Sequence, residues 1–116
     1  MTGVQTCALP ISVTSVTRAS AQAWRIESTT RASYYPGATP VTVKVVADAT
    51  GGRLLGAQIV GREGAAKRID VLATAIWNEM TVEEIQQLDL GYAPPFSPVW
   101  DPVLVAARKA GAVPPK

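Results

Sequence analysis

The sequence contains no histidine and only one cysteine, Cys7. A catalytic triad built on histidine is therefore excluded, and one cysteine alone does not provide the usual ligand set for zinc. A single cysteine also permits neither an internal disulfide nor a CxxC redox pair. We expect no metal site and assign no role to Cys7.

Charged residues are scarce as well: they make up 17% of the chain, against about 25% in an average soluble domain. The net charge of +2 comes without a basic run, which gives nucleic-acid binding little support. No apolar stretch approaches the roughly 20 residues that cross a bilayer. We expect no membrane contact and a cytoplasmic location.

Apolar residues, in contrast, are abundant: 47% of the 116 residues are hydrophobic. A chain of this length forms one domain, and such a domain buries only about two-thirds of the surface that it exposes when unfolded. The remaining apolar residues should form exposed patches, which usually mark interfaces. The composition therefore predicts a partner protein.

The first twelve residues, "MTGVQTCALPIS", lack clear periodicity and the layout of a signal peptide. They resemble a peptide that recurs when a sequencing adapter is translated at the end of a metagenomic fragment; the alternative is a disordered native N-terminus. We interpret residues 1–12 as a non-native scar, residues 13–22 as poorly defined, and residues 23–116 as the domain.

Apolar and polar side chains alternate in three segments, which is the period of a half-buried strand. These segments are residues 23–30, 41–48 and 53–61, and the Gly51-Gly52 pair between the last two predicts a β-hairpin. Gly56 inside the third segment predicts a bulge or a close backbone approach.

Helical spacing replaces this alternation from Gly64 onward. The apolar positions are Ala65, Ile69, Leu72, Ala73, Ile76 and Met80. Thr81 and Glu84 form a capping box that starts a second helix, expected to end near Gly91. Strands followed by helices predict an α+β fold, with an antiparallel sheet of three to four strands packed against two to three helices.

The third helix is predicted over residues 102–110, because Asp101 and Pro102 form a start signal and Gly111 a stop. The sequence "LDLGYAPPFSPVWDP", residues 88–102, leads into it, and we call it the aromatic arm. Its adjacent prolines predict a stiff, extended backbone that holds Tyr92 and Phe96 in place at low entropic cost. The arm either inserts against another surface or covers the core of its own domain.

A second aromatic segment, "SYYPG", residues 33–37, is called the tyrosine turn, since its Pro-Gly pair predicts a turn. Tyrosines beside a turn are often interface residues, because the ring is buried while the hydroxyl stays hydrated. Tyr34 and Tyr35 could supply a catalytic phenol; alternatively, one ring packs in the core and the other lies on the surface.

Lys67 and Arg68 lie near the N-terminus of the predicted first helix, where unpaired N–H groups attract anions. They could bind a phosphate or carboxylate, although the spacing is not that of a P-loop. The alternative is a solvated face or pairing with Glu63 and Asp70. No serine has a plausible base, so the residues alone indicate a docking or interface module.

Three blocks in order carry a family resemblance: "SYYPGATPVTVKVVAD", "RLLGAQIVGREGAAKRIDVLATAI" and "LDLGYAPPFSPVWDPV". Together, over about residues 23–110, they resemble the C-terminal dimerisation domain of the pyridine nucleotide-disulfide oxidoreductases. The most similar branch is that of coenzyme A disulfide reductase and NADH oxidase-like flavoproteins. The glutathione-reductase branch carries a His-Pro pair where this chain has "YAPPF", which favours the former branch.

The resemblance implies an FAD-dependent enzyme that oxidises NAD(P)H and forms homodimers through this domain. It implies that Tyr92 and Tyr34, or else Tyr35, reach the partner subunit's active site. They would act there as hydrogen-bond donors to a thiolate or a peroxide-level intermediate. Pro94, Pro95 and Phe96 would lie near the partner flavin, and Lys67 and Arg68 would lie toward coenzyme A phosphates.

The family's glycine-rich dinucleotide loops and redox cysteine are absent from this chain. We therefore expect an inactive fragment whose FAD is bound mainly by a missing N-terminal part. The acceptor stays open among coenzyme A or another thiol or disulfide, peroxide, oxygen and sulfur species, as does the choice of NADH or NADPH. The alternative function is a free-standing small dimerisation or ligand-binding module without catalytic activity.

Overall fold

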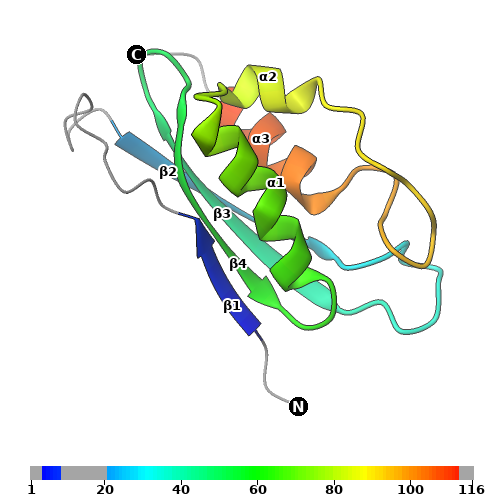
Figure 1. Cartoon of the computed structure of the whole chain (residues 1–116). Coiled ribbons are helices and arrows are strands. Elements are labelled where there is room, and N and C mark those ends of the chain that lie inside the picture. The colour runs from blue at the N-terminus through cyan, green and yellow to red at the C-terminus, as the bar shows by residue number, and fades with distance from the viewer. Residues whose placement is uncertain (1–3, 9–20, 113–116) are drawn as a thin grey trace.

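A computed structural model describes residues 4–8 and 21–112 of the chain. Four antiparallel strands form one sheet in the order β1-β4-β3-β2: β1 (Val4–Ala8), β2 (Ala21–Thr29), β3 (Pro40–Asp48) and β4 (Leu54–Gly61). The helices α1 (Ala65–Trp77), α2 (Val82–Gln86) and α3 (Pro102–Gly111) follow and lie on one face of this sheet (Figure 1). The predicted α+β fold is confirmed.

The edge strand β1 was not predicted from the sequence. It lies inside the segment interpreted as a scar and pairs with β4 in antiparallel register, from Val4 opposite Gly61 to Ala8 opposite Ala57. The interpretation of residues 1–12 as non-native stays a prediction.

The predicted β-hairpin is present and forms the centre of the sheet. Val43 and Val45 of β3 are fully buried beneath the helices, while the intervening Lys44 is exposed on the other face. The turn closes through the N–H of Gly52, which donates to the carbonyl of Asp48 at 2.8 Å, and Gly52 has a positive φ of 73°. The register shifts beside Gly56, which confirms the predicted bulge.

The buried face of α1 differs in part from the predicted stripe. Ala65, Ile69, Leu72 and Ile76 are buried as expected, but Ala73 is exposed and Ala75 is buried. The face is centred on Leu72, and the helical period of 3.6 residues places positions 68 and 75 on it, at one turn to either side. Arg68 is therefore buried, although its charge suggested a position off the stripe.

Both predicted helix starts are confirmed by their caps. The hydroxyl of Thr81 accepts a hydrogen bond from the N–H of Glu84 at 3.1 Å, and the Asp101 carboxylate accepts one from the N–H of Val103 at 2.9 Å. The prediction that α2 continues to near Gly91 was wrong, since α2 ends at Gln86. The N–H groups of Gln87 and Leu88 donate to carbonyls three residues back, and this tighter winding ends the helix.

No helix within residues 21–112 combines the length and apolar character needed to span a bilayer. The same described part of the chain holds no cluster of three or more acidic, cysteine or histidine side chains arranged for a metal ion.

Candidate functional site

The two predicted tyrosine sites meet at one place on the surface. The tyrosine turn follows β2, the aromatic arm precedes α3, and the two segments lie side by side at one end of the molecule (Figure 1). The hydroxyls of Tyr34 and Tyr92, 58 positions apart in the sequence, lie 3.4 Å from each other. It is therefore the hydroxyl of Tyr34, of the two tyrosines in the turn, that meets Tyr92.

This contact changes the acidity of a phenol. The hydrogen bond with Tyr34 raises the pKa of Tyr92 above its ordinary value of 10.0, and desolvation adds to the effect. Both causes favour the protonated form. Tyrosine is neutral at physiological pH already at its ordinary pKa, and this contact moves the pKa of Tyr92 further above that range.

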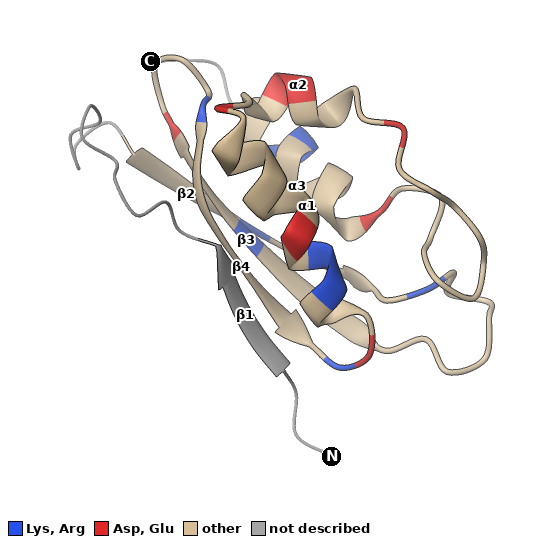
Figure 2. Cartoon of the chain, viewed as in Figure 1, with Lys and Arg blue, Asp and Glu red and all other residues tan. Residues whose placement is uncertain are grey.

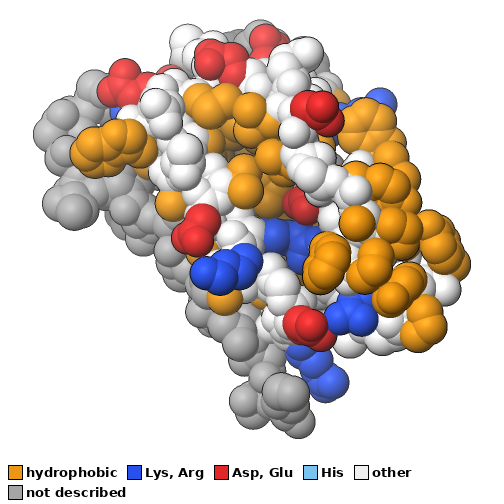
Figure 3. Space-filling model, turned by 45° about the vertical axis from the view of Figure 1, so that its right-hand side comes forward, with side chains coloured by type: hydrophobic (Ala, Val, Ile, Leu, Met, Phe, Trp, Pro, Cys, Tyr) orange, Lys and Arg blue, Asp and Glu red, His pale blue; other side chains and the backbone are white. Residues whose placement is uncertain are grey.

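The tyrosine pair belongs to an exposed aromatic patch. Tyr34 is 74% exposed, Phe96 is 78% exposed, and Val99 and Trp100 of the aromatic arm are exposed as well. Figure 3 shows hydrophobic side chains gathered on the side of the molecule that carries these two segments. An apolar patch of this kind usually marks an interface, which agrees with the partner predicted from the composition.

The backbone of the aromatic arm differs from its prediction. Pro94 and Pro95 do not extend the chain; they begin a tight turn in which the N–H groups of Phe96 and Ser97 both donate to the carbonyl of Ala93, at 2.9 and 3.0 Å. The φ that proline imposes is shared by extended and turn conformations, so the proline pair alone does not decide between them. The turn leaves the side chain of Phe96 in solvent.

The buried side chain of Arg68 connects the segment before the tyrosine turn with the aromatic arm. Its side chain is 8% exposed, and it forms an ion pair with Asp101 through Nε at 3.1 Å. Its Nη2 group donates to the carbonyl of Thr30 at 2.7 Å and to the carbonyl of Phe96 at 3.0 Å. Its partners are therefore neither Glu63 nor Asp70, the two that the sequence suggested.

Gly64 makes room for this arrangement. It is the N-cap of α1 and has a positive φ of 86°. A Cβ atom at this position would lie 2.9 Å from Nη1 of Arg68. The backbone conformation therefore favours glycine, and a larger residue would also displace the end of the Arg68 side chain.

Lys67 has the opposite environment. It is exposed on the first turns of α1, where Figure 2 shows basic residues next to an acidic one. The sequence suggested that Glu63 pairs with Lys67 or Arg68, but the Glu63 carboxylate accepts a hydrogen bond from Arg31 at 2.8 Å. Arg31 also donates to the carbonyl of Pro36 at 3.1 Å, so a second arginine supports the tyrosine turn.

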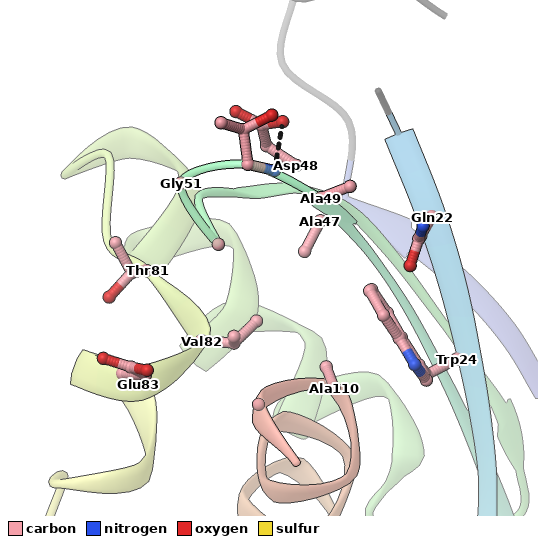
Figure 4. A pocket seen from close by; sticks show the side chains of 13 residues that line it. Gln22, Trp24, Ala47, Asp48, Ala49, Gly51, Thr81, Val82, Glu83 and Ala110 are labelled. Carbon is pink, nitrogen blue, oxygen red and sulfur yellow. Dashed lines mark hydrogen bonds between the residues drawn. The ribbon is translucent and has the colours of Figure 1, made fainter. Parts of the chain in front are cut away.

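A hollow of about 310 Å³ lies away from these residues, where the β3–β4 turn meets α2 and the end of α3 (Figure 4). Trp24, Asp48, Thr81 and Glu83 contribute to its wall, and the N–H of Thr50 donates to Asp48 at 3.1 Å. None of the residues predicted as site residues lines it. The tyrosine pair, which is exposed, is the better candidate for a site completed by another molecule.

Residues 9–102 match the family described as pyridine nucleotide-disulphide oxidoreductase, dimerisation domain. The chain belongs to this family. This confirms the resemblance carried by the three sequence blocks, and it places the tyrosine pair and Arg68 within a dimerisation domain.

Relatives of this dimerisation domain include enzymes of the expected branch. Coenzyme A disulfide reductase of Staphylococcus aureus (strain JH9) is 43% identical over 79 residues, which are 68% of this chain and 18% of that protein. Among solved structures, a NAD-dependent persulfide reductase from A. fulgidus is 44% identical to this chain, with a TM-score of 0.76. The match covers 78% of this chain and 17% of the persulfide reductase chain.

Two further solved structures are similar to this chain. Reduced CoADR-RHD of Bacillus anthracis is 41% identical with a TM-score of 0.76, over 78% of this chain and 16% of that one. The water-forming NADH oxidase from Lactobacillus brevis shares the fold, with a TM-score of 0.77 and 24% identity. That match covers 80% of this chain and 21% of the oxidase chain. The chain spans only 18% of the length of the curated relative described above.

Proposed function

We propose that this domain forms the homodimer contact of an FAD-dependent NAD(P)H oxidoreductase of the disulfide-reductase or NADH-oxidase type. In this proposal Tyr34 and Tyr92 project into the active site of the partner subunit. The observation that carries the proposal is the contact between their hydroxyls, 3.4 Å apart, within an exposed aromatic patch.

The tyrosine pair has the chemistry of a hydrogen-bond donor. Each phenol has one O–H group, so when one hydroxyl donates to the other, one O–H remains to donate outward. Such a donor stabilises negative charge on a thiolate or on an oxygen species in the partner's site.

The residues of this chain do not form an FAD site by themselves, because the sequence has no glycine-rich dinucleotide loop. We propose that FAD and NAD(P)H are bound mainly by an N-terminal part of a longer protein, where the flavin supplies the hydride chemistry. Pro94, Pro95 and Phe96 would contribute an apolar wall near the partner's flavin, and the 116-residue chain alone would be inactive.

Coenzyme A, or another thiol or disulfide, is the proposed type of substrate. Of the two basic residues assigned to its phosphates, Lys67 is exposed, whereas Arg68 is buried and its Nε and Nη2 groups already donate to Asp101, Thr30 and Phe96. Lys67 is therefore the better candidate for a phosphate contact, as a mobile ammonium group.

Mixed dimers of the longer protein test whether the tyrosines act across the interface. One subunit carries Tyr34→Phe and Tyr92→Phe, and the other carries a serine in place of its redox cysteine. If the tyrosines act in the partner, one of the two sites in each mixed dimer is complete, and about half of the activity per dimer returns. If they act within their own subunit, no site is complete and the mixture stays inactive.

Single variants assign the tyrosine of the turn. Tyr34→Phe should lower kcat as Tyr92→Phe does, whereas a larger loss in Tyr35→Phe would transfer the role to Tyr35. Reading the genome upstream of Val13 tests the parent protein and the interpretation of residues 1–12, since dinucleotide-binding loops should be encoded there. If no such loops are found and the chain alone forms a stable folded dimer, the free-standing module is the better description.

A further inference from the structure

We propose that Arg68 is a positioning residue that sets the geometry of the Tyr34–Tyr92 pair by serving as one rung of a ladder between the two loops. The functional meaning of this inference rests on the proposed role of the tyrosines. The geometric claim concerns a single chain and can be tested by itself.

The tyrosine turn and the residues before it run antiparallel to the aromatic arm, with a cross-link at every second residue. Arg68 joins the carbonyls of Thr30 and Phe96. The N–H of Ala32 then donates to the carbonyl of Pro94 at 3.2 Å. The last rung is the contact between the hydroxyls of Tyr34 and Tyr92.

The arm needs an external donor because of its prolines. In an ordinary antiparallel ladder each strand supplies N–H donors as well as carbonyl acceptors, but Pro94 and Pro95 have no N–H group. The N–H of Phe96 is used within its own turn. At the first rung two carbonyl oxygens face each other, and a guanidinium group, which has only donors, links them.

Arginine is suited to this place in a way that lysine is not. Its planar group donates from Nε to Asp101 and from Nη2 to two carbonyls at once, whereas a lysine ammonium has no such fixed fork. Asp101 in turn accepts from the hydroxyl of Ser97 at 3.1 Å and caps α3. The arginine is therefore fixed on α1 and α3, the elements of the core.

The consequence is a rigid support for an exposed pair. Tyr34 is 74% and Tyr92 47% exposed, so packing alone does not hold their rings in one place. The rung made by Arg68 lies four residues from each tyrosine and fixes both loops relative to the core. Without it, the hydroxyls should separate.

The test compares variants of the 116-residue chain in which the tyrosine rings are labelled with ¹³C and titrated with alkali by NMR. Tyr34→Phe removes the partner hydroxyl and should lower the titration midpoint of Tyr92. The double variant Arg68→Met with Asp101→Asn should lower that midpoint by as much. Adding Tyr34→Phe to the double variant should then produce no further shift.

The double variant is chosen to spare the fold and the charge balance. It removes one charge of each sign, so the net charge of +2 is kept. Asparagine still caps a helix through its Oδ1, and its Nδ2 group can donate to the hydroxyl of Ser97, which keeps the carbonyl of Pro98 as its acceptor. Lys67→Met is the control, because it removes a neighbouring exposed cation that makes no rung, and it should leave the Tyr92 midpoint unchanged.

Three results would overturn the inference. The first is a Tyr92 midpoint in the double variant equal to that of the unaltered chain. The second is a Tyr34→Phe chain with no shift, because the pair would then not exist. The third is loss of the fold in the double variant, since the pair would then serve the core instead of the tyrosines.

Variants at Arg68 and Asp101 also distinguish a failure of this inference from a failure of the proposed function. In the longer protein, the Arg68→Met, Asp101→Asn variant should lower kcat without removing the phenols, and Arg68→Lys should retain part of it. If the NMR shifts occur but mixed dimers stay inactive, the ladder is correct and the function across the interface is wrong. If mixed dimers recover activity but the shifts do not occur, only the ladder is wrong.

Discussion

The hairpin under α1 and the pair of loops at the end of the sheet are stabilised in different ways. In the first region Val43, Val45 and Leu72 are 0% exposed, whereas in the second Tyr34 and Phe96 are 74% and 78% exposed. Apolar burial is non-directional and is shared among many contacts. The loops rely instead on a few directed hydrogen bonds around one buried arginine, so a single substitution can change their geometry without removing the fold.

The largest expected effect is a loss of unfolding free energy, which should be large for a substitution in the core and small for one in the exposed loops. Leu72→Ala leaves a cavity in the core and should lower the free energy of unfolding by about 3 kcal/mol. Phe96→Ala removes a larger side chain from the surface and should change it by less than about 0.5 kcal/mol. Urea titration of both variants measures the difference, and equal losses would show that Phe96 packs against the domain itself.

A smaller effect is expected where the two regions join. Arg68→Met alone leaves Asp101, whose side chain is 13% exposed, without its cationic partner, and should cost about 2 kcal/mol of unfolding free energy. The double variant with Asp101→Asn should cost less, because no unpaired charge remains. Lys67→Met is the matched control in the same titration. A double variant that is less stable than the single one would contradict this account.

The smallest effect concerns backbone strain. Among the described residues Glu79 is the only non-glycine with a positive φ, 56°. It is an exposed residue just after the C-terminal end of α1, whereas Arg68 and the loops that it joins lie at the N-terminal end of that helix. Glu79→Gly relieves this strain and should raise the unfolding free energy by about 0.5 kcal/mol. The substitution also removes an ion pair with Arg53 at 3.2 Å, but such an exposed pair contributes little. Glu79→Ala keeps the strain and loses the same pair, so it should be less stable than Glu79→Gly.

Much of the first region was predictable because its patterns are local. Alternation gave β3 and β4, Gly56 gave the bulge, and the residues Thr81 and Asp101 marked two helix starts. The end of α2 was missed, because Gly91 was taken as the stop although the helix tightens five residues earlier. The strand β1 was missed because its segment has no strand period and was set aside.

The candidate site was only partly predictable. The sequence named Tyr34, Tyr92 and Arg68 as separate candidates, but it gave no sign that the tyrosine hydroxyls meet or that the arginine lies beneath both loops. One signal was available: position 68 lies one helical turn before Leu72, on the buried face. The charge of the side chain outweighed this periodicity in the interpretation, because a buried arginine needs partners that a linear sequence does not show.

The sequence by itself determined the class of the fold, the order of the predicted strands and helices, and the family, because these depend on periodicity, caps and motifs carried by neighbouring residues. Only the tertiary structure decided that the proline pair forms a turn and that Arg68 links Thr30 to Phe96. The physical reason is that proline fixes φ but not ψ, and that a buried guanidinium is placed by acceptors from segments 28 and 38 residues away in the chain.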